Sequence, residues 1–150
     1  DTTVEVTTYR TEKYEEDSRN PDVEFGDTIE GDLSRRDFTV NSMALELTGS
    51  KPEFIDPFNG LGNLAERILR TPASARQSFT DDPLRMMRAA RFASQLNFAI
   101  DEEVLSAMST MASRISIISA ERVREEFTKL LMSAHPRLGI TILVDTGIQS

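Results

Sequence analysis

The stretch DDPLRMMRAARF places two acids and a proline in front of a helical run that carries an arginine at every third position. Asp82 suits the N-cap of that helix and Pro83 its first position, because a carboxylate can accept from the first free N–H groups. Arg85, Arg88 and Arg91 follow one another around the helix, each about 60° behind the last. Such groups could hold an anionic ligand, but they are equally typical of a capped helix with a solvated basic edge.

The residues between these arginines argue against a fully solvated edge. They are apolar around much of the helix and comprise Leu84, Met86, Met87, Ala89, Ala90, Phe92 and Ala93. Some of the arginines must therefore lie beside buried surface, where a charged side chain needs a partner.

A second cluster of polar residues lies in DLSRRDFTVNSMA, which holds Arg35, Arg36, Asp37 and Asn41. If this segment is helical, Asp37 and Asn41 share a face at i, i+4. Guanidinium groups for phosphate and a carboxylate for sugar hydroxyls would be coherent chemistry. Taken alone, the RRD triplet favours an ordinary surface salt-bridge cluster.

The composition excludes several classes of protein. The 150 residues are 39% hydrophobic, without an apolar run long enough to span a bilayer or a secretory signal at the start. No cysteine and a single histidine exclude disulfides, thiolate metal sites and a histidine-containing catalytic triad within this chain. A cytosolic enzyme or binding module remains.

The net charge of −8 argues at first sight against a nucleic-acid partner. The charge is unevenly distributed, however, because residues 1–60 hold 15 acids and 6 bases whereas residues 61–150 hold 10 acids and 11 bases. The first part is therefore strongly acidic, whereas the second part is close to neutral.

The first part predicts a small α+β unit. VEVTTYR alternates strictly and predicts a strand that carries Glu5, and the acidic residues 11–31 predict a loop. A turn or two of helix is expected from Asp32 through SRRDFTVN. SMALELT and EFIDPF flank a turn and predict a hairpin, followed by a short helix over about 60–66 and the strand-like RILRT. Three strands with none before them form an incomplete sheet.

The second part predicts helices only. Residues 73–80 are small and polar and are interpreted as a linker. Helices are expected over 83–96, after Asp101, after Ser119, and from Pro136 to Gly147. Because the apolar period changes from two to about 3.6 at the linker, we expect two packed but distinct units and no strand after Pro83.

The order and spacing of these motifs closely resemble the class II CCA-adding tRNA nucleotidyltransferases and their bacterial poly(A) polymerase relatives. The resemblance covers nearly the whole chain and depends most on RRDFTVN and DDPLRMMRAARF at this separation. It implies an α+β fold in which residues 1–72 form the C-terminal part of a polymerase-beta-type palm, or head, domain. Residues 73–150 would form an all-helical neck that selects the nucleotide.

The resemblance also implies roles for the first cluster and for the strand before it. Arg36 would bind the triphosphate, Arg35 would support it, and Asp37 and Asn41 would lie near the ribose. Glu5 corresponds to a third catalytic carboxylate, a minor ligand of Mg²⁺ beside two stronger ones.

The family's E-D-x-x-R motif falls on Asp81, Asp82 and Arg85. In the family, the last two positions act as an amino-acid template that pairs with the Watson–Crick edge of CTP or ATP. Arg88 and Arg91 would add further nucleotide contacts. The chain departs from the usual pattern at Asp81, where Glu is common, and at Asn63, where Asp is common.

The family's G-G-x-x-R-D turn and D-x-D metal pair are not found in this sequence, which we therefore interpret as a fragment. The complete enzyme implied is cytoplasmic, has no membrane segment, and adds CMP and AMP from CTP and ATP to tRNA 3′ ends without a nucleic-acid template. The RNA 3′-hydroxyl would attack the α-phosphate while two Mg²⁺ ions stabilise the attacking and leaving oxygens. The tRNA would be held mostly by regions outside this sequence.

Two alternatives remain open at this point. One is a poly(A) polymerase, or an enzyme that adds only CC or only A, within the same family. The other is a nucleotide-binding fragment without catalysis of its own.

The 150-residue chain alone should incorporate no nucleotide into RNA at any Mg²⁺ concentration, because Glu5 by itself cannot position two metal ions. Labelled CTP or ATP, a tRNA that lacks its CCA end and a Mg²⁺ series test this directly. Turnover by the pure chain would overturn the account of its metal site.

Overall fold

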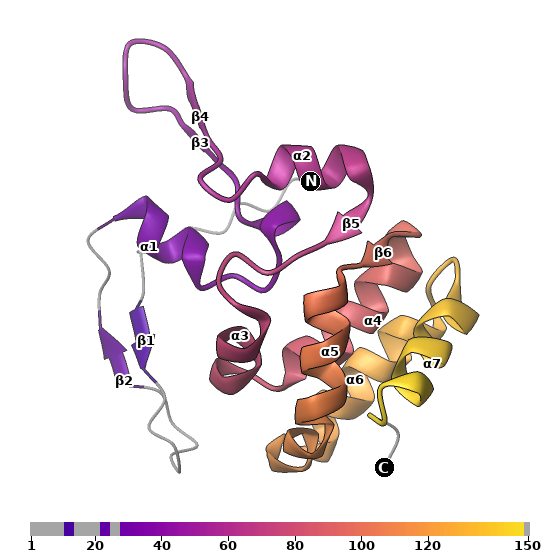
Figure 1. The fold of residues 1–150 in the computed structure, drawn as a ribbon. Helices are drawn as coiled ribbons and strands as arrows, with labels where there is room; N and C mark the ends of the chain where they lie inside the picture. The colour runs from indigo at the N-terminus through magenta and orange to yellow at the C-terminus, as the bar shows by residue number, and fades with distance from the viewer. Residues whose placement is uncertain (1–10, 14–21, 25–27, 149–150) are drawn as a thin grey trace.

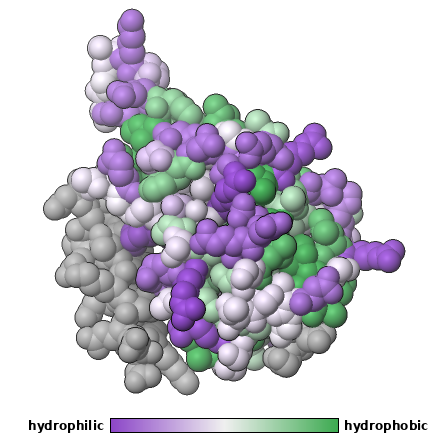
Figure 2. All heavy atoms as spheres, in the orientation of Figure 1, coloured by the Kyte–Doolittle hydropathy of each residue, from purple (hydrophilic) through white to green (hydrophobic). Residues whose placement is uncertain are grey.

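The computed structural model describes residues 11–13, 22–24 and 28–148. In the first part of the chain the helices and strands are short, and their bounds are β1 Thr11–Lys13, β2 Asp22–Glu24, α1 Ile29–Ser34, the 3₁₀ turn η1 Thr39–Asn41, β3 Ala44–Glu46, β4 Glu53–Ile55, α2 Gly60–Glu66 and β5 Ile68–Leu69. The β1–β2 and β3–β4 pairs are antiparallel hairpins. Figure 1 shows the β3–β4 hairpin projecting from the rest of the fold, and Figure 2 shows hydrophilic side chains at its tip.

The second part is almost entirely helical, and its bounds are α3 Ala75–Asp81, α4 Leu84–Leu96, β6 Ala99–Ile100, α5 Glu102–Met111, the 3₁₀ segment η2 Ala112–Ile117, α6 Ala120–Leu131 and α7 Pro136–Asp145. Three helices begin at serine or aspartate caps: Ser74, Asp101 and Ser119 each accept from a backbone N–H of the following turn. None of the described helices has both the length and the apolar composition needed to cross a membrane.

Helix α4 lies at the centre of the helical part and packs against both α6 and α7. Its apolar side chains are almost fully buried, and they include Leu84, Met86, Met87, Ala89, Ala90 and Ala93. The crossing with α7 depends on Gly139, because a Cβ built there would lie 2.2 Å from Ser94 Oγ and 2.8 Å from the Ala90 carbonyl oxygen. The two helices are therefore in close backbone contact where they cross.

The two parts of the chain are joined rather than merely adjacent. Strand β5 pairs in parallel with β6, and beside this pair Arg70 Nε donates to Asp101 Oδ2 at 2.9 Å. That hydrogen bond from Arg70 is the largest of the effects that lower the pKa of Asp101. The rings of Phe38 and Phe92 meet edge to face at a centroid distance of 5.8 Å. The division at residue 72 stays a prediction, and the core extends across it.

Most of the predicted elements are confirmed. The β3–β4 hairpin, the short helix α2, the β5 strand and the four main helices lie where the sequence placed them. Helix α7 ends at Asp145, two residues before the expected stop. The strand predicted in VEVTTYR, with Glu5, lies outside the described residues.

Three predictions about the first part and the linker are wrong. Residues 11–31 are not simply a loop, since they contain β1, β2 and the start of α1. The predicted helix from Asp32 ends at Ser34, and Arg35–Phe38 are not helical. The predicted linker 73–80 is mostly helix α3, in which Ala75, Ser78 and Phe79 face the core at helical spacing.

The prediction of no strand after Pro83 is also wrong, at β6. The Ala99 N–H donates to the Arg67 carbonyl at 2.9 Å and the Asp101 N–H donates to the Leu69 carbonyl at 3.1 Å. Ala99 and Ile100 are extended because β5, from the first part of the chain, pairs with them. A local sequence pattern does not reveal such a partner.

Gly139→Ala should lower the free energy of unfolding by about 1–3 kcal/mol, because the added methyl group collides with the backbone of α4. Urea unfolding followed by circular dichroism measures the change. Gly49→Ala is the matched control, because its Cβ would meet only the Lys51 carbonyl, at 3.4 Å. Equal stability of the two variants would contradict the close crossing of α4 and α7.

Candidate nucleotide-binding site

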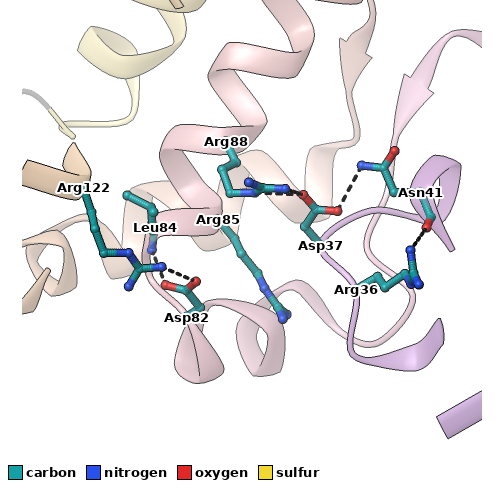
Figure 3. Close-up of a pocket in the computed structure, with 8 residues that line it drawn as sticks. All are labelled: Arg36, Asp37, Asn41, Asp82, Leu84, Arg85, Arg88 and Arg122. Atoms are coloured by element: carbon teal, nitrogen blue, oxygen red, sulfur yellow. Dashed lines mark hydrogen bonds and ion pairs between the residues drawn. The ribbon is translucent and has the colours of Figure 1, made fainter. Parts of the chain in front are cut away.

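An open pocket of about 480 Å³ lies between the segment that follows α1, the start of α4 and the first turn of α6. Its lining residues, drawn in Figure 3, are Arg36, Asp37, Asn41, Asp82, Leu84, Arg85, Arg88 and Arg122. Six of the nine side chains predicted from the sequence therefore lie around one cavity. Guanidinium groups, carboxylates and an amide together can bind a ligand that is both anionic and rich in hydrogen-bonding groups.

Asp37 organises one wall of the pocket. It is 7% exposed, and its Oδ1 accepts from the Phe38 N–H at 2.9 Å and from Asn41 Nδ2 at 3.1 Å. Its Oδ2 accepts from Arg88 Nε at 2.9 Å and from Arg88 Nη2 at 2.5 Å. The helix on which Asp37 and Asn41 were expected to share a face does not form, since Asp37 lies outside the 3₁₀ turn η1, but the two side chains still meet through a hydrogen bond. The carboxylate thus fixes both the amide and a bidentate arginine.

The turn η1 that carries Asn41 is held by residues from further along the chain. The Thr39 N–H donates to the Arg70 carbonyl at 2.8 Å, and Thr39 Oγ1 donates to Asn63 Oδ1, also at 2.8 Å. Gly60 permits this approach, because a Cβ there would lie 2.3 Å from the Thr39 carbonyl oxygen. The wall of the pocket is therefore anchored to α2 and β5.

Arg35 and Arg36 share the carboxylate of Asp32. Arg35 Nη2 and Arg36 Nη2 each donate to one of its oxygens at 3.1 Å. Arg36 also donates to the Asn41 carbonyl at 3.3 Å, lines the pocket and keeps 49% of its side chain exposed. Arg35 is not among the lining residues, and its backbone carbonyl accepts from Arg85.

The two carboxylate oxygens of Asp82 have different partners, one at the start of α4 and the other at the rim of the pocket. The regular helix begins at Leu84, one residue later than predicted, and Asp82 Oδ1 accepts from the Leu84 N–H at 3.1 Å. The prediction that Asp82 is the N-cap of this helix is wrong, because Pro83 occupies that position and Asp82 is the C-cap of α3, although its carboxylate still accepts from an N–H at the helix start. Its Oδ2 accepts from Arg122 Nη2 at 3.2 Å.

Arg85 lies one turn beyond Asp82 and is held by two other segments. Its Nη1 donates to Ser78 Oγ at 2.9 Å, and its Nη2 donates to the Arg35 carbonyl. The base-reading candidate Arg85 thus contacts the backbone of Arg35, 50 residues earlier in the chain and directly before the phosphate-binding candidate Arg36.

Arg91 lies away from the pocket. Only 8% exposed, it donates through Nε to Glu126 Oε2 at 2.6 Å and through Nη1 to Gln95 Oε1 at 2.7 Å. Its guanidinium carbon lies 4.0 Å from the centroid of the Phe92 ring. The structure places this side chain in the packing between α4 and α6.

Three basic side chains surround the carboxylate of Glu126. Besides Arg91, Lys129 Nζ donates to its Oε1 at 3.3 Å, and Arg88 Nη1 lies 4.0 Å from the same oxygen. Burial acts to raise the pKa of Glu126, but the hydrogen bond and charge of Arg91, with Lys129 and Arg88, hold that pKa below its usual value. Glu126 is therefore a buried anion that supports two arginines of α4.

The sequence analysis missed Arg122 and Glu126. Ser119 as the cap of α6 already places Arg122 in the first turn, and Glu126 falls between the apolar positions Val123 and Leu130. That placement could have marked Glu126 as buried. Their partners, Asp82 and Arg91, lie 40 and 35 residues away, and no local pattern connects them.

Glu5, the predicted carboxylate ligand of Mg²⁺, lies outside the described residues. Within the part of the chain that the structure describes, no group of three or more Asp, Glu or His side chains could hold a metal ion. The described residues therefore do not fit a metal centre by themselves.

Glu126→Gln should destabilise the fold by about 1–3 kcal/mol at neutral pH, because a neutral amide replaces a buried, paired carboxylate. Since the folded-state pKa of Glu126 is lowered, its contribution is present above the unfolded-state pKa and is lost as the pH falls through the folded-state value. The difference in unfolding free energy between wild type and variant should therefore shrink below about pH 4.

Urea unfolding at a series of pH values measures that difference. Glu125→Gln, at an exposed position on the same helix, should stay within about 0.5 kcal/mol of wild type at every pH. A pH-independent effect of Glu126→Gln would show that the carboxylate is not charged in the folded state.

Two family models match the chain. The model described as the poly(A) polymerase head domain matches residues 1–70, and the one described as the probable RNA- and SrmB-binding site of polymerase A matches residues 97–149. The CCA-adding enzyme of Lactiplantibacillus plantarum is 45% identical over 145 residues, which are 96% of this chain and 35% of that protein. The corresponding enzyme of Enterococcus faecalis is 42% identical over 95% of this chain and 34% of its own length.

Solved structures agree with these matches. The Bacillus stearothermophilus CCA-adding enzyme in complex with CTP superposes with a TM-score of 0.83 at 38% identity, over 96% of this chain and 34% of that one. The Thermotoga maritima CCA-adding enzyme complexed with tRNA gives a TM-score of 0.74 at 31% identity, over 80% and 30%. This chain spans about a third of the length of these relatives and belongs to the family of CCA-adding enzymes and bacterial poly(A) polymerases.

Proposed function

We propose that the protein to which this chain belongs adds CMP and AMP from CTP and ATP to the 3′ ends of tRNA, and that the pocket selects the incoming nucleotide. One observation carries this proposal: the base-reading candidates Asp82 and Arg85 open on the same cavity as Arg36, Asp37 and Asn41. A nucleoside triphosphate has its base and its phosphates at opposite ends, so a site that holds both needs this juxtaposition.

The phosphate end would lie against Arg36. Its guanidinium is half exposed and is oriented by Asp32 and by the Asn41 carbonyl. Asn41, whose amide nitrogen donates to Asp37, presents an oriented amide to the ribose. Arg88 is already bidentate on Asp37 and contributes positive charge beside the phosphates. Arg35 and Arg91 act from behind this surface rather than on the nucleotide.

The base end would lie against Asp82 and Arg85. Asp82 Oδ2, which accepts from Arg122, has a second lone pair for the exocyclic amino group of cytosine or adenine. Arg85 has five N–H donors; its Nη1 binds Ser78 and its Nη2 binds the Arg35 carbonyl, so the remaining N–H groups, including Nε–H, can donate to the ring nitrogen. Uracil and guanine have a carbonyl in place of this amino group. Since the carbonyl and the Asp82 carboxylate both accept hydrogen bonds, both would be left unpaired.

The reaction proposed is attack of the RNA 3′-hydroxyl on the α-phosphorus, with pyrophosphate as the leaving group. Mg²⁺ would supply charge neutralisation at the reacting oxygens. We assign no step through the metal to the described residues, because they lack a suitable ligand cluster. Their part is to bind, orient and select the nucleotide. Since the substrate is tRNA, we propose the cytoplasm as the location.

Arg85→Ala in the complete enzyme should lower both the rate and the selectivity for CTP and ATP over UTP and GTP, by about 1–3 kcal/mol per lost buried contact. Asp82→Asn separates two roles, because an amide oxygen can still accept from the Leu84 N–H but the second group becomes a donor. Stability should stay nearly constant while selectivity falls.

Single-nucleotide incorporation on tRNAs that end before the tail, in C or in CC measures all of these effects. The same assay separates CCA addition from poly(A) addition and from CC- or A-only addition. Arg124→Ala, an exposed arginine of α6 outside the pocket, should keep the wild-type selectivity. If Asp82→Asn also keeps it, Asp82 serves only the helix end and the template proposal fails.

A further inference from the structure

Ser78 is a buried polar residue in a helix that the sequence did not predict. It lies in α3 and is 2% exposed, between the core residues Ala75 and Phe79. A hydroxyl in such a position needs a partner, because an unpaired buried polar group is costly. Its partner is not another core residue but the guanidinium of Arg85.

Both base-reading candidates meet at this serine. Ser78 Oγ accepts from Arg85 Nη1 at 2.9 Å, and the Ser78 carbonyl accepts from the Asp82 N–H at 3.1 Å. The side chain of Arg85 and the backbone of Asp82 are therefore both hydrogen-bonded to Ser78. A shift of Ser78 would change the distance between them.

The other end of the guanidinium is held from a different direction. Arg85 Nη2 donates to the Arg35 carbonyl, in the segment that leads into the phosphate-binding cluster. A planar guanidinium bound at both terminal nitrogens has a fixed plane as well as a fixed position. Arg85 Nη1 also donates to the Ser78 carbonyl, at 3.5 Å. Of the three acceptors, only the Ser78 hydroxyl belongs to a side chain, so only this one can be removed by substitution.

We propose that Ser78 is a specificity-determining positioning residue that orients Arg85 for base recognition. The proposal rests on the proposed function, since it assumes that Arg85 reads the base. Without the hydroxyl, Arg85 keeps its charge, its place on α4 and its contacts with the Ser78 and Arg35 carbonyls. It loses its 2.9 Å hydrogen bond to Ser78 Oγ, the shorter of the two at Nη1, and its guanidinium is oriented less precisely. Correct bases would then bind less well, and wrong bases would be excluded less strictly.

The test is Ser78→Ala in the complete enzyme, with KM and kcat measured separately for CTP, ATP, UTP and GTP. The preference for CTP and ATP should fall about tenfold, which corresponds to one lost hydrogen bond to a charged group. Most of the change should be in KM for the correct nucleotides. Ser78→Thr, which keeps the hydroxyl, should restore the preference.

Ser94→Ala is the matched control. Ser94 is also fully buried in a helix, and its Oγ donates to the Ala90 carbonyl at 3.0 Å beside Gly139, away from the pocket. It should cost stability comparable to that of Ser78→Ala and leave nucleotide preference unchanged. If Ser78→Ala folds poorly, Ser78→Cys, which keeps the volume but weakens the acceptor, should move the preference in the same direction.

A double-substitution cycle distinguishes the two levels of the proposal. In an Arg85→Ala background, Ser78→Ala should change the preference no further, because its effect passes through Arg85. Unchanged preference in Ser78→Ala and Ser78→Cys, with preference lost in Arg85→Ala, would overturn the role of Ser78 and leave the proposed function standing. Unchanged preference in Arg85→Ala as well would overturn the proposed function itself.

Discussion

The arrangement of the site depends on one constraint: the arginines of α4 project from a helix whose other side chains form the core, so each needs a partner that removes the cost of burial. Arg88 pairs with Asp37 and Arg91 pairs with Glu126, whereas Arg85 donates to three neutral oxygens. These partners come from three different regions of the chain. Pairing the charges therefore brings the segment after α1, helix α3 and helix α6 around α4, and the pocket is the space that remains open between them.

This arrangement gives the pocket a fixed back and an adaptable rim. Asp37 and Glu126 are almost fully buried and bound on several sides, whereas Arg36 and Arg122 keep about half of their side chains exposed. Groups held in place before a ligand arrives lose little conformational freedom on binding, which favours discrimination between similar bases. The rim arginines can adjust to a flexible triphosphate, whose charge attracts any guanidinium within reach.

The sequence was informative at helix starts with a strong cap residue. Asp101 and Ser119 predicted helix starts through their caps. The prediction failed where an element is short or is stabilised by residues far away in the chain. SARQSFTD is polar on average and was expected to be a linker, yet it forms a helix whose Phe79 is buried in the core. Likewise, Arg122 is 40 residues from Asp82 in the chain, and only the packing of α6 on α4 brings them together.

The β5–β6 pair, with the Arg70–Asp101 ion pair beside it, brings the entry and the exit of residues 68–101 to the same place. Everything between them, including α3, Ser78, Asp82 and the arginines of α4, forms a closed excursion from that point. The two ends of this segment are fixed to each other, but α4 also packs against α6 and α7, so an exchange of the segment would need matching surfaces on those helices. The residues proposed to choose the base would thus be inherited together with their partners Asp37 and Glu126, rather than as a separate cassette.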